Sequence, residues 1–415
     1  MKFGDFRRAG HWPSLLCAFL YFDISFMVWV LLGALANSIG PEFGLSDSRK
    51  GFLVAVPILG GAVLRLVLGV MTDYFGARRT ALIGLILTLI PLTFGWLWAD
   101  SFLKLLMVGL MLGVAGASFA AALPLASRWY PPQYQGLAMG IAGAGNSGTA
   151  LATFFAPRLA ALLGWHAVFG LALIPVCLTL VIFALFAKDA PGRPAPKKLA
   201  EYATVLRARD TWWFCLFYGV TFGGFVGLAS FLNIYFHTQF GLSPVTAGVF
   251  ATACVVAGSC LRPVGGYLAD RIGGINLLIV LYCAIGLMML DMTTAPPLAW
   301  ATVVVIAIMG VLGLGNGAVF QLVPQRFPKE IGVMTGIVGA AGGVGGFFLP
   351  TLLGGVKQLT GGFGGGFLLF GLIAFASAGA LVAVSKTWEG VFVAKGGRAA
   401  APNLVRTAAF VESHE

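Results

Sequence analysis

Two arginines, Arg65 and Arg262, lie in the middle of apolar stretches of this sequence, 197 residues apart. The residues around them recur at the same spacing, so that Gly61, Gly69, Asp73 and Gly76 are matched by Gly258, Gly266, Asp270 and Gly273. A charge at the centre of a membrane-spanning helix costs roughly 3 kcal/mol even on the most lenient scale. Two such charges in matching places therefore predict a bound anion between them.

The composition indicates that the surrounding helices lie in a membrane. Hydrophobic residues make up 59% of the 415 positions and charged residues only 10%, which is too little polar surface for a water-soluble globule of this size. About twelve stretches are long enough to cross the hydrocarbon core as helices. They are 14–37, 51–72, 80–98, 102–125, 136–157, 166–187, 212–236, 245–268, 276–295, 299–322, 332–354 and 363–386. We therefore predict an all-α polytopic membrane protein.

The basic residues predict the orientation of these helices. Of the 26 lysines and arginines, 19 fall in one set of alternate loops and five in the other, and the remaining two are Arg65 and Arg262. The positive-inside rule then places both termini in the cytoplasm. This loop pattern explains the net charge of +11 without a nucleic-acid partner.

The first apolar stretch has an alternative interpretation as a cleaved signal peptide, because basic residues precede it and it contains Ala34-Leu35-Ala36. It is too long for the apolar region of a signal peptide, and its removal would break the repeat, so we expect the first helix of the bundle. The six cysteines all lie inside predicted spans without metal-ligand spacing, and we expect neither a metal nor a cofactor.

A polar segment with Pro191, Pro194 and Pro196 divides the chain into two sets of six spans. We predict an N-terminal six-helix bundle (1–187), a cytoplasmic linker (188–209), a C-terminal six-helix bundle (210–386) and a largely unstructured cytoplasmic tail (387–415). The repeat continues through Gly113 and Gly116, which match Gly310 and Gly313. Two halves repeated in the same direction predict a carrier with its site at their interface, near the middle of the membrane.

The junction after the second span reads Gly69-Val70-Met71-Thr72-Asp73-Tyr74-Phe75-Gly76-Ala77-Arg78-Arg79 and resembles the signature loop of the major facilitator superfamily. The resemblance implies that superfamily's fold, with twelve transmembrane helices in two six-helix pseudo-repeats. It also implies a gating latch between the halves, formed by Asp73, Arg78, Arg79 and Asp270. The second copy has Asp270 and Arg271 but lacks the double arginine. Ordinary interfacial charge is the alternative for these residues.

Two glycine-rich helices resemble the nitrate signatures of the nitrate/nitrite porter family within that superfamily. They are Gly140-Ile141-Ala142-Gly143-Ala144-Gly145-Asn146-Ser147-Gly148 and Gly336-Ile337-Val338-Gly339-Ala340-Ala341-Gly342-Gly343-Val344-Gly345-Gly346. Close helix packing alone is the alternative for the signature glycines Gly143, Gly145, Gly148, Gly339, Gly342 and Gly343. Their coincidence with Arg65 and Arg262 favours the family. Because Gly342 stands where the repeat would place a partner for Asn146, we expect a one-sided polar contact.

The resemblance implies a transporter of the bacterial cytoplasmic (inner) membrane that acts as a monomer in the lipid bilayer on nitrate and nitrite. Arg65 and Arg262 would hold the anion and Asn146 would donate an amide hydrogen. Tyr218 would supply a hydroxyl, and Phe26, Phe119 and Phe222 would form apolar walls, although each phenylalanine has lipid or core packing as its alternative. The planar fork of a guanidinium matches the coplanar oxygens of these monoanions.

The central charges also bear on energy coupling. Two guanidinium groups without a carboxylate beside them repel each other when the site is empty, which favours nitrate/nitrite exchange. Asp23 lies in the apolar part of the first helix and is a candidate for proton coupling, or else a paired or hydrated carboxylate near the cytoplasmic mouth. Proton-coupled symport and carriage of another small monovalent anion remain alternatives. An enzyme or receptor is disfavoured, because no predicted span holds a cluster of catalytic or metal-binding groups.

Overall fold

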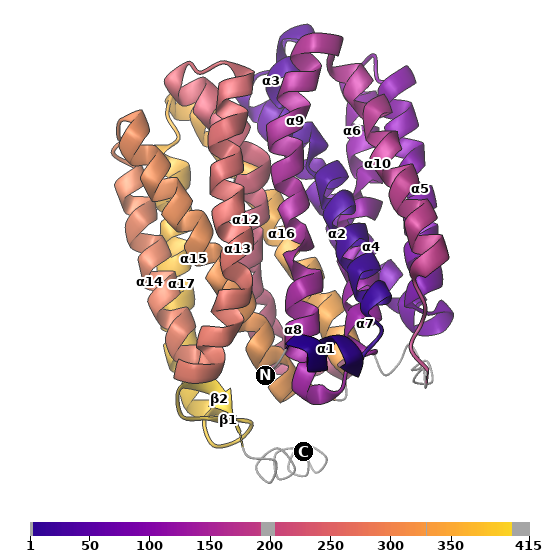
Figure 1. Cartoon of the computed structure of the whole chain (residues 1–415). Helices are drawn as coiled ribbons and strands as arrows, with labels where there is room; N and C mark the ends of the chain where they lie inside the picture. Colours follow the sequence, from indigo (N-terminus) through magenta and orange to yellow (C-terminus); the bar gives the residue numbers. More distant parts are fainter. Residues whose placement is uncertain (1–2, 192–203, 329, 401–415) are drawn as a thin grey trace.

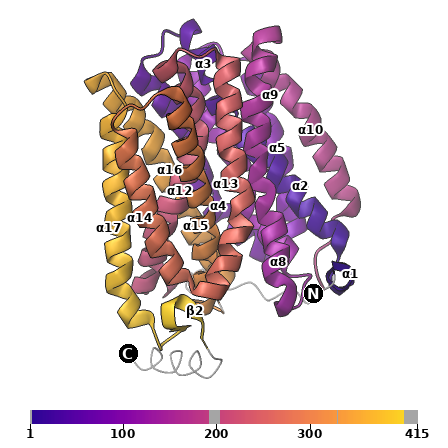
Figure 2. The ribbon, with the colours of Figure 1, turned by 60° about the vertical axis from the view of Figure 1, so that its left-hand side comes forward.

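The computed structural model describes residues 3–191, 204–328 and 330–400 of the chain. Long helices run side by side and form a bundle, with α1 and the short strands β1 and β2 at the same end (Figures 1 and 2). The helices are α1 (Phe3–Ala9), α2 (Trp12–Trp29), α3 (Leu31–Glu42), α4 (Asp47–Phe75), α5 (Ala77–Leu97), α6 (Phe102–Gly116), α7 (Phe119–Ser127), α8 (Pro132–Gly143), η1 (Ala144–Ser147), α9 (Gly148–Leu163), α10 (Trp165–Phe186), α12 (Arg209–Phe240), α13 (Pro244–Ile272), α14 (Gly274–Met292), α15 (Leu298–Arg326), α16 (Ile331–Thr360), α17 (Gly364–Trp388) and η2 (Lys395–Gly397).

Within the described residues, eleven helices are long and apolar enough to cross a membrane. The remaining expected span, 136–157, is interrupted, because the one-turn 3₁₀ helix η1 separates α8 from α9. Glycine favours such a break, since it is a poor helix former, and Gly143, Gly145 and Gly148 all fall at this point. The all-α membrane fold predicted from the sequence is confirmed, and the interruption lies within one of the two glycine-rich signatures.

The proposed halves meet along three helix pairs, in which α4 packs on α16, α9 on α13, and α3 on α12. Glycines make this approach possible at the end of the bundle away from α1. A Cβ added at Gly51 of α4 would lie 3.2 Å from the Cα of Gly354 on α16. Hydrogen bonds also cross between the halves. Examples are the bond from the amide Nδ2 of Asn37 to the carbonyl of Asn233 (2.8 Å) and the bond between the hydroxyls of Thr153 and Thr252 (2.8 Å).

Three glycines nearer to the end that carries α1 and the strands lack such close contacts. A Cβ added at Gly69, Gly140 or Gly336 would meet no described heavy atom within 4 Å. Gly69 follows Arg65 by about one helical turn, and Gly336 precedes Gly339 by three residues on the opposite side of the interface. The close contact between Gly51 and Gly354 thus marks a closed end of the bundle, away from α1.

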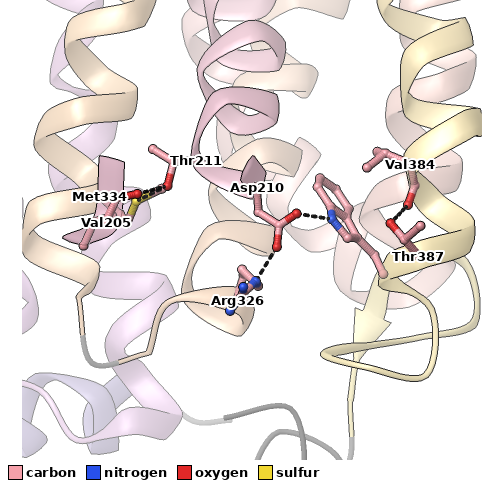
Figure 3. Close-up of polar contacts among 8 residues, drawn as sticks. Val205, Asp210, Thr211, Arg326, Met334, Val384 and Thr387 are labelled. Atoms are coloured by element: carbon pink, nitrogen blue, oxygen red, sulfur yellow. Dashed lines mark hydrogen bonds and ion pairs between the residues drawn. The ribbon is translucent and has the colours of Figure 1, made fainter. Parts of the chain in front are cut away.

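The described part of the predicted tail, residues 387–400, is folded, and the expectation of a largely unstructured tail is wrong for it. β1 (Val393–Ala394) and β2 (Arg398–Ala399) form an antiparallel pair, and Trp388, Phe392 and Val393 are buried. Asp210 accepts hydrogen bonds from Nε of Arg326 (2.5 Å) and from the indole nitrogen of Trp388 (2.8 Å), as Figure 3 shows. Trp388 and Phe392 provide apolar surface that can be buried. The basic residues of this segment had instead suggested an unfolded tail. Residues 401–415, like 192–203 of the linker, lie outside the described residues.

We predict that Gly354→Val lowers the melting temperature of the purified protein clearly more than Gly355→Val does. A Cβ at position 354 would lie 2.6 Å from the backbone carbonyl oxygen of Asp47, whereas one at position 355 would meet open space. Overpacking of this kind typically costs about 1–3 kcal/mol. Both substitutions make the same change of helix propensity at neighbouring positions, so equal melting temperatures would show that the closed end does not depend on this contact.

Candidate functional site

Arg65 lies at the centre of the bundle with 1% of its surface exposed. Its Nε donates to the carbonyl of Gly116 (3.0 Å), and its Nη1 donates to the carbonyl of Gly339 on α16, in the opposite half (2.6 Å). No described group accepts a hydrogen bond from Nη2. The guanidinium carbon lies 5.2 Å from the ring centre of Trp29 and 4.8 Å from that of Phe222, so aromatic faces replace part of the lost hydration.

Arg262 is the equivalent residue on α13 and is 8% exposed. Its Nη2 donates to the hydroxyl of Tyr218 (3.4 Å), while Nη1 has no acceptor among the described residues. The ring centre of Phe119 lies 5.6 Å from the guanidinium carbons of both Arg65 and Arg262. The structure thus brings the two predicted arginines to one aromatic side chain, each with an unused donor.

The ion pairs between described residues do not include either of these arginines; they join Lys104 to Asp100, Arg128 to Asp73, and Arg326 to Asp210. Two buried positive charges are consequently compensated only by carbonyls, a hydroxyl and aromatic faces. Buried charge without a counter-ion is costly, so the arrangement suits a bound anion.

The predicted aromatic residues surround the arginines. Tyr218 stacks on Phe222 with 5.0 Å between ring centres, and Phe222 lies 6.4 Å from Phe26. Three further aromatic side chains belong to this group and were not predicted from the sequence. The ring centre of Phe22 is 5.6 Å from that of Phe119, and the ring centre of Phe320 is 4.9 Å from that of Tyr218. The third is Trp29, whose ring faces the guanidinium of Arg65.

A sequence signal existed for two of the three missed residues. Phe22 precedes the predicted Phe26 by about one helical turn and therefore lies on the same helix face. Trp29 fits because glycines leave room for its indole: a Cβ added at Gly61 would lie 2.7 Å from the indole ring, and one at Gly116 would also collide with it. Gly61 and Gly116, which belong to the internal repeat, were therefore a sequence signal for a large side chain packed against them.

Asn146 lies in η1, fully buried, and neither atom of its amide has a hydrogen-bond partner in the described structure. Beside it, Asp23 accepts hydrogen bonds from the hydroxyl of Ser147 (2.7 Å) and from the backbone N–H of Gly148. These two donors belong to the start of α9, where the helix dipole favours a carboxylate. Asp23, which belongs to α2, therefore hydrogen-bonds the start of α9 next to the 3₁₀ turn that carries Asn146.

Four of the six signature glycines, Gly145, Gly148, Gly342 and Gly343, leave space that neighbouring side chains or backbone occupy. A Cβ at Gly342 would lie 2.6 Å from the ring of Tyr218 and 2.9 Å from that of Phe222, and one at Gly339 would lie 3.6 Å from Cδ of Arg65. A Cβ at Gly343 would lie 2.7 Å from that of Ala62, a residue of α4. Cβ atoms at Gly145 and Gly148 would collide with Phe22 and Asp23, whereas one at Gly143 would reach only to 3.9 Å from Nε of Arg262.

The predicted latch residues lie at the end of the bundle that carries α1. Asp73 forms an ion pair with Arg128 (3.0 Å), and Nη2 of Arg78 donates to the carbonyl of Ala184 (2.7 Å). Asp270 hydrogen-bonds Gln321, and Arg79 is exposed. Each of these contacts stays within one half. A latch between the halves therefore stays a prediction.

Comparison with known proteins is consistent with this architecture. The family model described as Major Facilitator Superfamily matches residues 17–350. The nitrite extrusion protein of Bacillus subtilis (strain 168) is 35% identical over 85% of this chain and 89% of its own length. The probable nitrate/nitrite transporter NarK2 of Mycobacterium tuberculosis (strain ATCC 25618 / H37Rv) is 36% identical, over 83% of this chain and 89% of its own.

The chain belongs to the nitrate/nitrite porter family of the major facilitator superfamily. The family and fold predicted from the sequence are therefore confirmed, and this porter is a multi-pass membrane transporter, not an enzyme. A solved structure with the same fold is a bacterial homologue of the human lysosomal transporter Spinster, in an inward-facing and occupied conformation. It has a TM-score of 0.67 at 20% identity and covers 90% of this chain and 96% of its own.

We predict that Gly342→Ala in this porter weakens anion binding at least severalfold, because the new methyl group must displace the rings of Tyr218 and Phe222. Gly336→Ala is the matched control on the same helix, since a Cβ there meets open space. Titration of the purified proteins with small anions measures both effects. If Gly342→Ala binds as well as the control, the aromatic positions do not determine affinity.

Proposed function

We propose that the protein moves nitrate and nitrite across the bacterial cytoplasmic membrane by alternating access, as a nitrate/nitrite exchanger. One observation carries the proposal: Arg65 and Arg262 are buried beside the same ring, each with an unused N–H donor and neither in an ion pair. The names of the similar bacterial proteins, a nitrite extrusion protein and a probable nitrate/nitrite transporter, support the choice of anion.

The chemistry of the site favours a small planar monoanion. Nitrate and nitrite spread one charge over coplanar oxygens, which the planar guanidinium fork matches better than an ammonium does. Faces of Trp29, Phe119 and Phe222 border the guanidinium of Arg65. Apolar walls cost a weakly hydrated ion less than they cost phosphate or sulfate, and those dianions would need more donors than this site provides.

Exchange follows from the charge balance at the centre. Both guanidinium carbons lie 5.6 Å from the ring centre of Phe119. They are therefore at most about 11 Å apart and repel each other by at least about 1.5 kcal/mol at an effective dielectric of 20, and one bound anion relieves most of this repulsion. The empty carrier therefore resists bringing its halves together, while the loaded carrier does so readily. Asp23, the candidate for proton coupling, already accepts two hydrogen bonds at the start of α9 and does not pair with either arginine.

The basic residues support one orientation. In the sequence, 19 of the 26 lysines and arginines belong to one set of alternate loops and ends, and this set includes α1 and β2, which favours the cytoplasm for that side. The closed end of the bundle then faces outward. We expect the monomer to be the functional unit, because both arginines and the aromatic walls come from one chain.

We predict that Arg65→Lys and Arg262→Lys each lose most nitrate uptake, on the order of 90% or more, while they insert and fold normally. Lysine keeps the charge but cannot form the two parallel hydrogen bonds of a guanidinium. The measurement is nitrate uptake into liposomes at matched protein content. Lys104→Arg, a change of the same pair of residue types at an exposed position, should leave uptake unchanged. Near-normal uptake by either central variant would remove the two-arginine site from the mechanism.

For the coupling mode, we expect nitrite or nitrate inside the liposomes to accelerate entry of external nitrate severalfold, and an imposed pH gradient to have a smaller effect. Asp23→Asn should retain exchange, because the amide oxygen can still accept from Ser147 and Gly148. Accumulation driven by a proton gradient without internal anion, and abolished in Asp23→Asn, would instead establish a proton symporter. Displacement of nitrate by low concentrations of formate would point to a carrier of small organic anions.

A further inference from the structure

The other half of the protein has two buried amides whose polar atoms both lack partners in the described structure, Asn233 on α12 and Asn316 on α15. Asn316 is the one that the internal repeat relates to the site. Asn316 has no exposed surface, and within the described structure neither its Nδ2 nor its Oδ1 has a hydrogen-bond partner. Buried polar groups in folded proteins almost always have a partner, and one left without protein partners requires an explanation such as a ligand or a water molecule. Neither the sequence signatures nor the predicted substrate contacts include this residue.

The internal repeat places Asn316 at the site. The spacing of 197 residues that relates Arg65 to Arg262 also relates Phe119 to Asn316. The packing around the two positions corresponds: a Cβ at Gly113 would collide with the backbone of Gly60 and Gly61, and one at Gly313 would collide with the backbone of Gly258. Since Phe119 borders both guanidinium groups, its counterpart is expected to lie beside them from the second half.

Direct contacts of the neighbouring residues agree with this placement. Phe320, one helical turn after Asn316, has its ring 4.9 Å from that of Tyr218 and 5.7 Å from that of Phe119. A Cβ at Gly315 would lie 2.6 Å from a methyl group of Thr221 on α12, and one at Gly317 would collide with the carbonyl of Arg262 on α13. Asn316 is therefore flanked by residues that contact the two helices bearing Tyr218 and Arg262.

The two halves present different surfaces at these equivalent positions. In the first half the ring of Phe119 lies close to Phe22, with 5.6 Å between ring centres. An offset of 196, which relates Phe26 to Phe222, pairs Phe22 with Tyr218, so an aromatic pair in the first half corresponds to a hydroxyl and an amide in the second. The first half thus supplies an apolar wall where the second half supplies hydrogen-bonding groups.

We propose that Asn316 binds the transported anion, with its amide nitrogen donating a hydrogen bond to an anion oxygen from the C-terminal half. The proposal rests on the proposed function and adds a determinant of selectivity to it. Nitrate has three oxygens and nitrite has two, so a donor additional to the two guanidinium groups and Asn146 benefits nitrate more. Loss of a donor from a site built for hydrogen bonding penalises the ligand that used it.

The test compares Asn316→Leu, which has nearly the same size but no polar atoms, with the wild-type protein. Nitrate and nitrite affinities are measured by calorimetry on the purified full-length protein, and melting temperatures are measured without anion. We expect nitrate affinity to fall on the order of tenfold and nitrite affinity to fall less. The melting temperature without anion should stay the same or rise, since the variant removes a buried amide that lacks a partner.

Ser377→Ala is the matched control. Ser377 is also buried with a hydroxyl that lacks a partner among the described residues, but it lies on α17, which packs on α14. We expect it to leave both affinities unchanged. Asn316→Ala serves as a second variant if the leucine side chain prevents folding, and the same loss of nitrate affinity is expected.

Unchanged nitrate affinity in the Asn316 variants, while the wild type binds nitrate, would overturn this proposal and leave the proposed function intact. A lower melting temperature with unchanged affinity would overturn it too, by assigning Asn316 to internal packing. Failure of the wild-type protein to bind either nitrate or nitrite would overturn the proposed function together with the role of Asn316.

Discussion

The structure depends on the cost of holding two positive charges in the middle of a membrane protein without carboxylates to balance them. One nearby aspartate each would neutralise the charges of Arg65 and Arg262, yet neither arginine forms an ion pair with a described residue. The surroundings instead offer carbonyls, a hydroxyl and aromatic faces, which lower the cost but leave donors unused. A bound anion would supply the negative charge that these two buried arginines lack.

Glycine residues allow aromatic rings to pack against the two central arginines. Gly61 and Gly116 leave room for the indole of Trp29, and Gly342 leaves room for the rings of Tyr218 and Phe222. Larger residues at these positions would push the rings away from the guanidinium groups they cover. The same residue type lets α4 approach α16 closely at one end of the bundle, so a single compositional feature serves both the site and the contact between halves.

The sequence predicted the central residues of the site because the internal repeat shows the same pattern in two corresponding helices. Arg65 and Arg262 were found in this way, and so were the glycines around them. Phe320 was missed because, among 34 phenylalanines, an aromatic residue facing a ligand has the same pattern as one facing lipid. The folded segment after Trp388 was missed for a related reason: its buried residues are few, and Asp210, the group that binds the indole of Trp388, is distant in sequence.

One hydrogen bond links recognition directly to conformation. Nη1 of Arg65 donates to the carbonyl of Gly339, which belongs to the opposite half, whereas Arg262 donates to a hydroxyl of its own half. A movement that separates α4 from α16 frees a second donor on Arg65, and a movement that joins them occupies it again. The number of donors that Arg65 can offer to an anion therefore depends on how closely α4 and α16 approach each other. The equivalent residue Arg262 lacks this dependence, because its hydrogen-bond partner Tyr218 belongs to its own half.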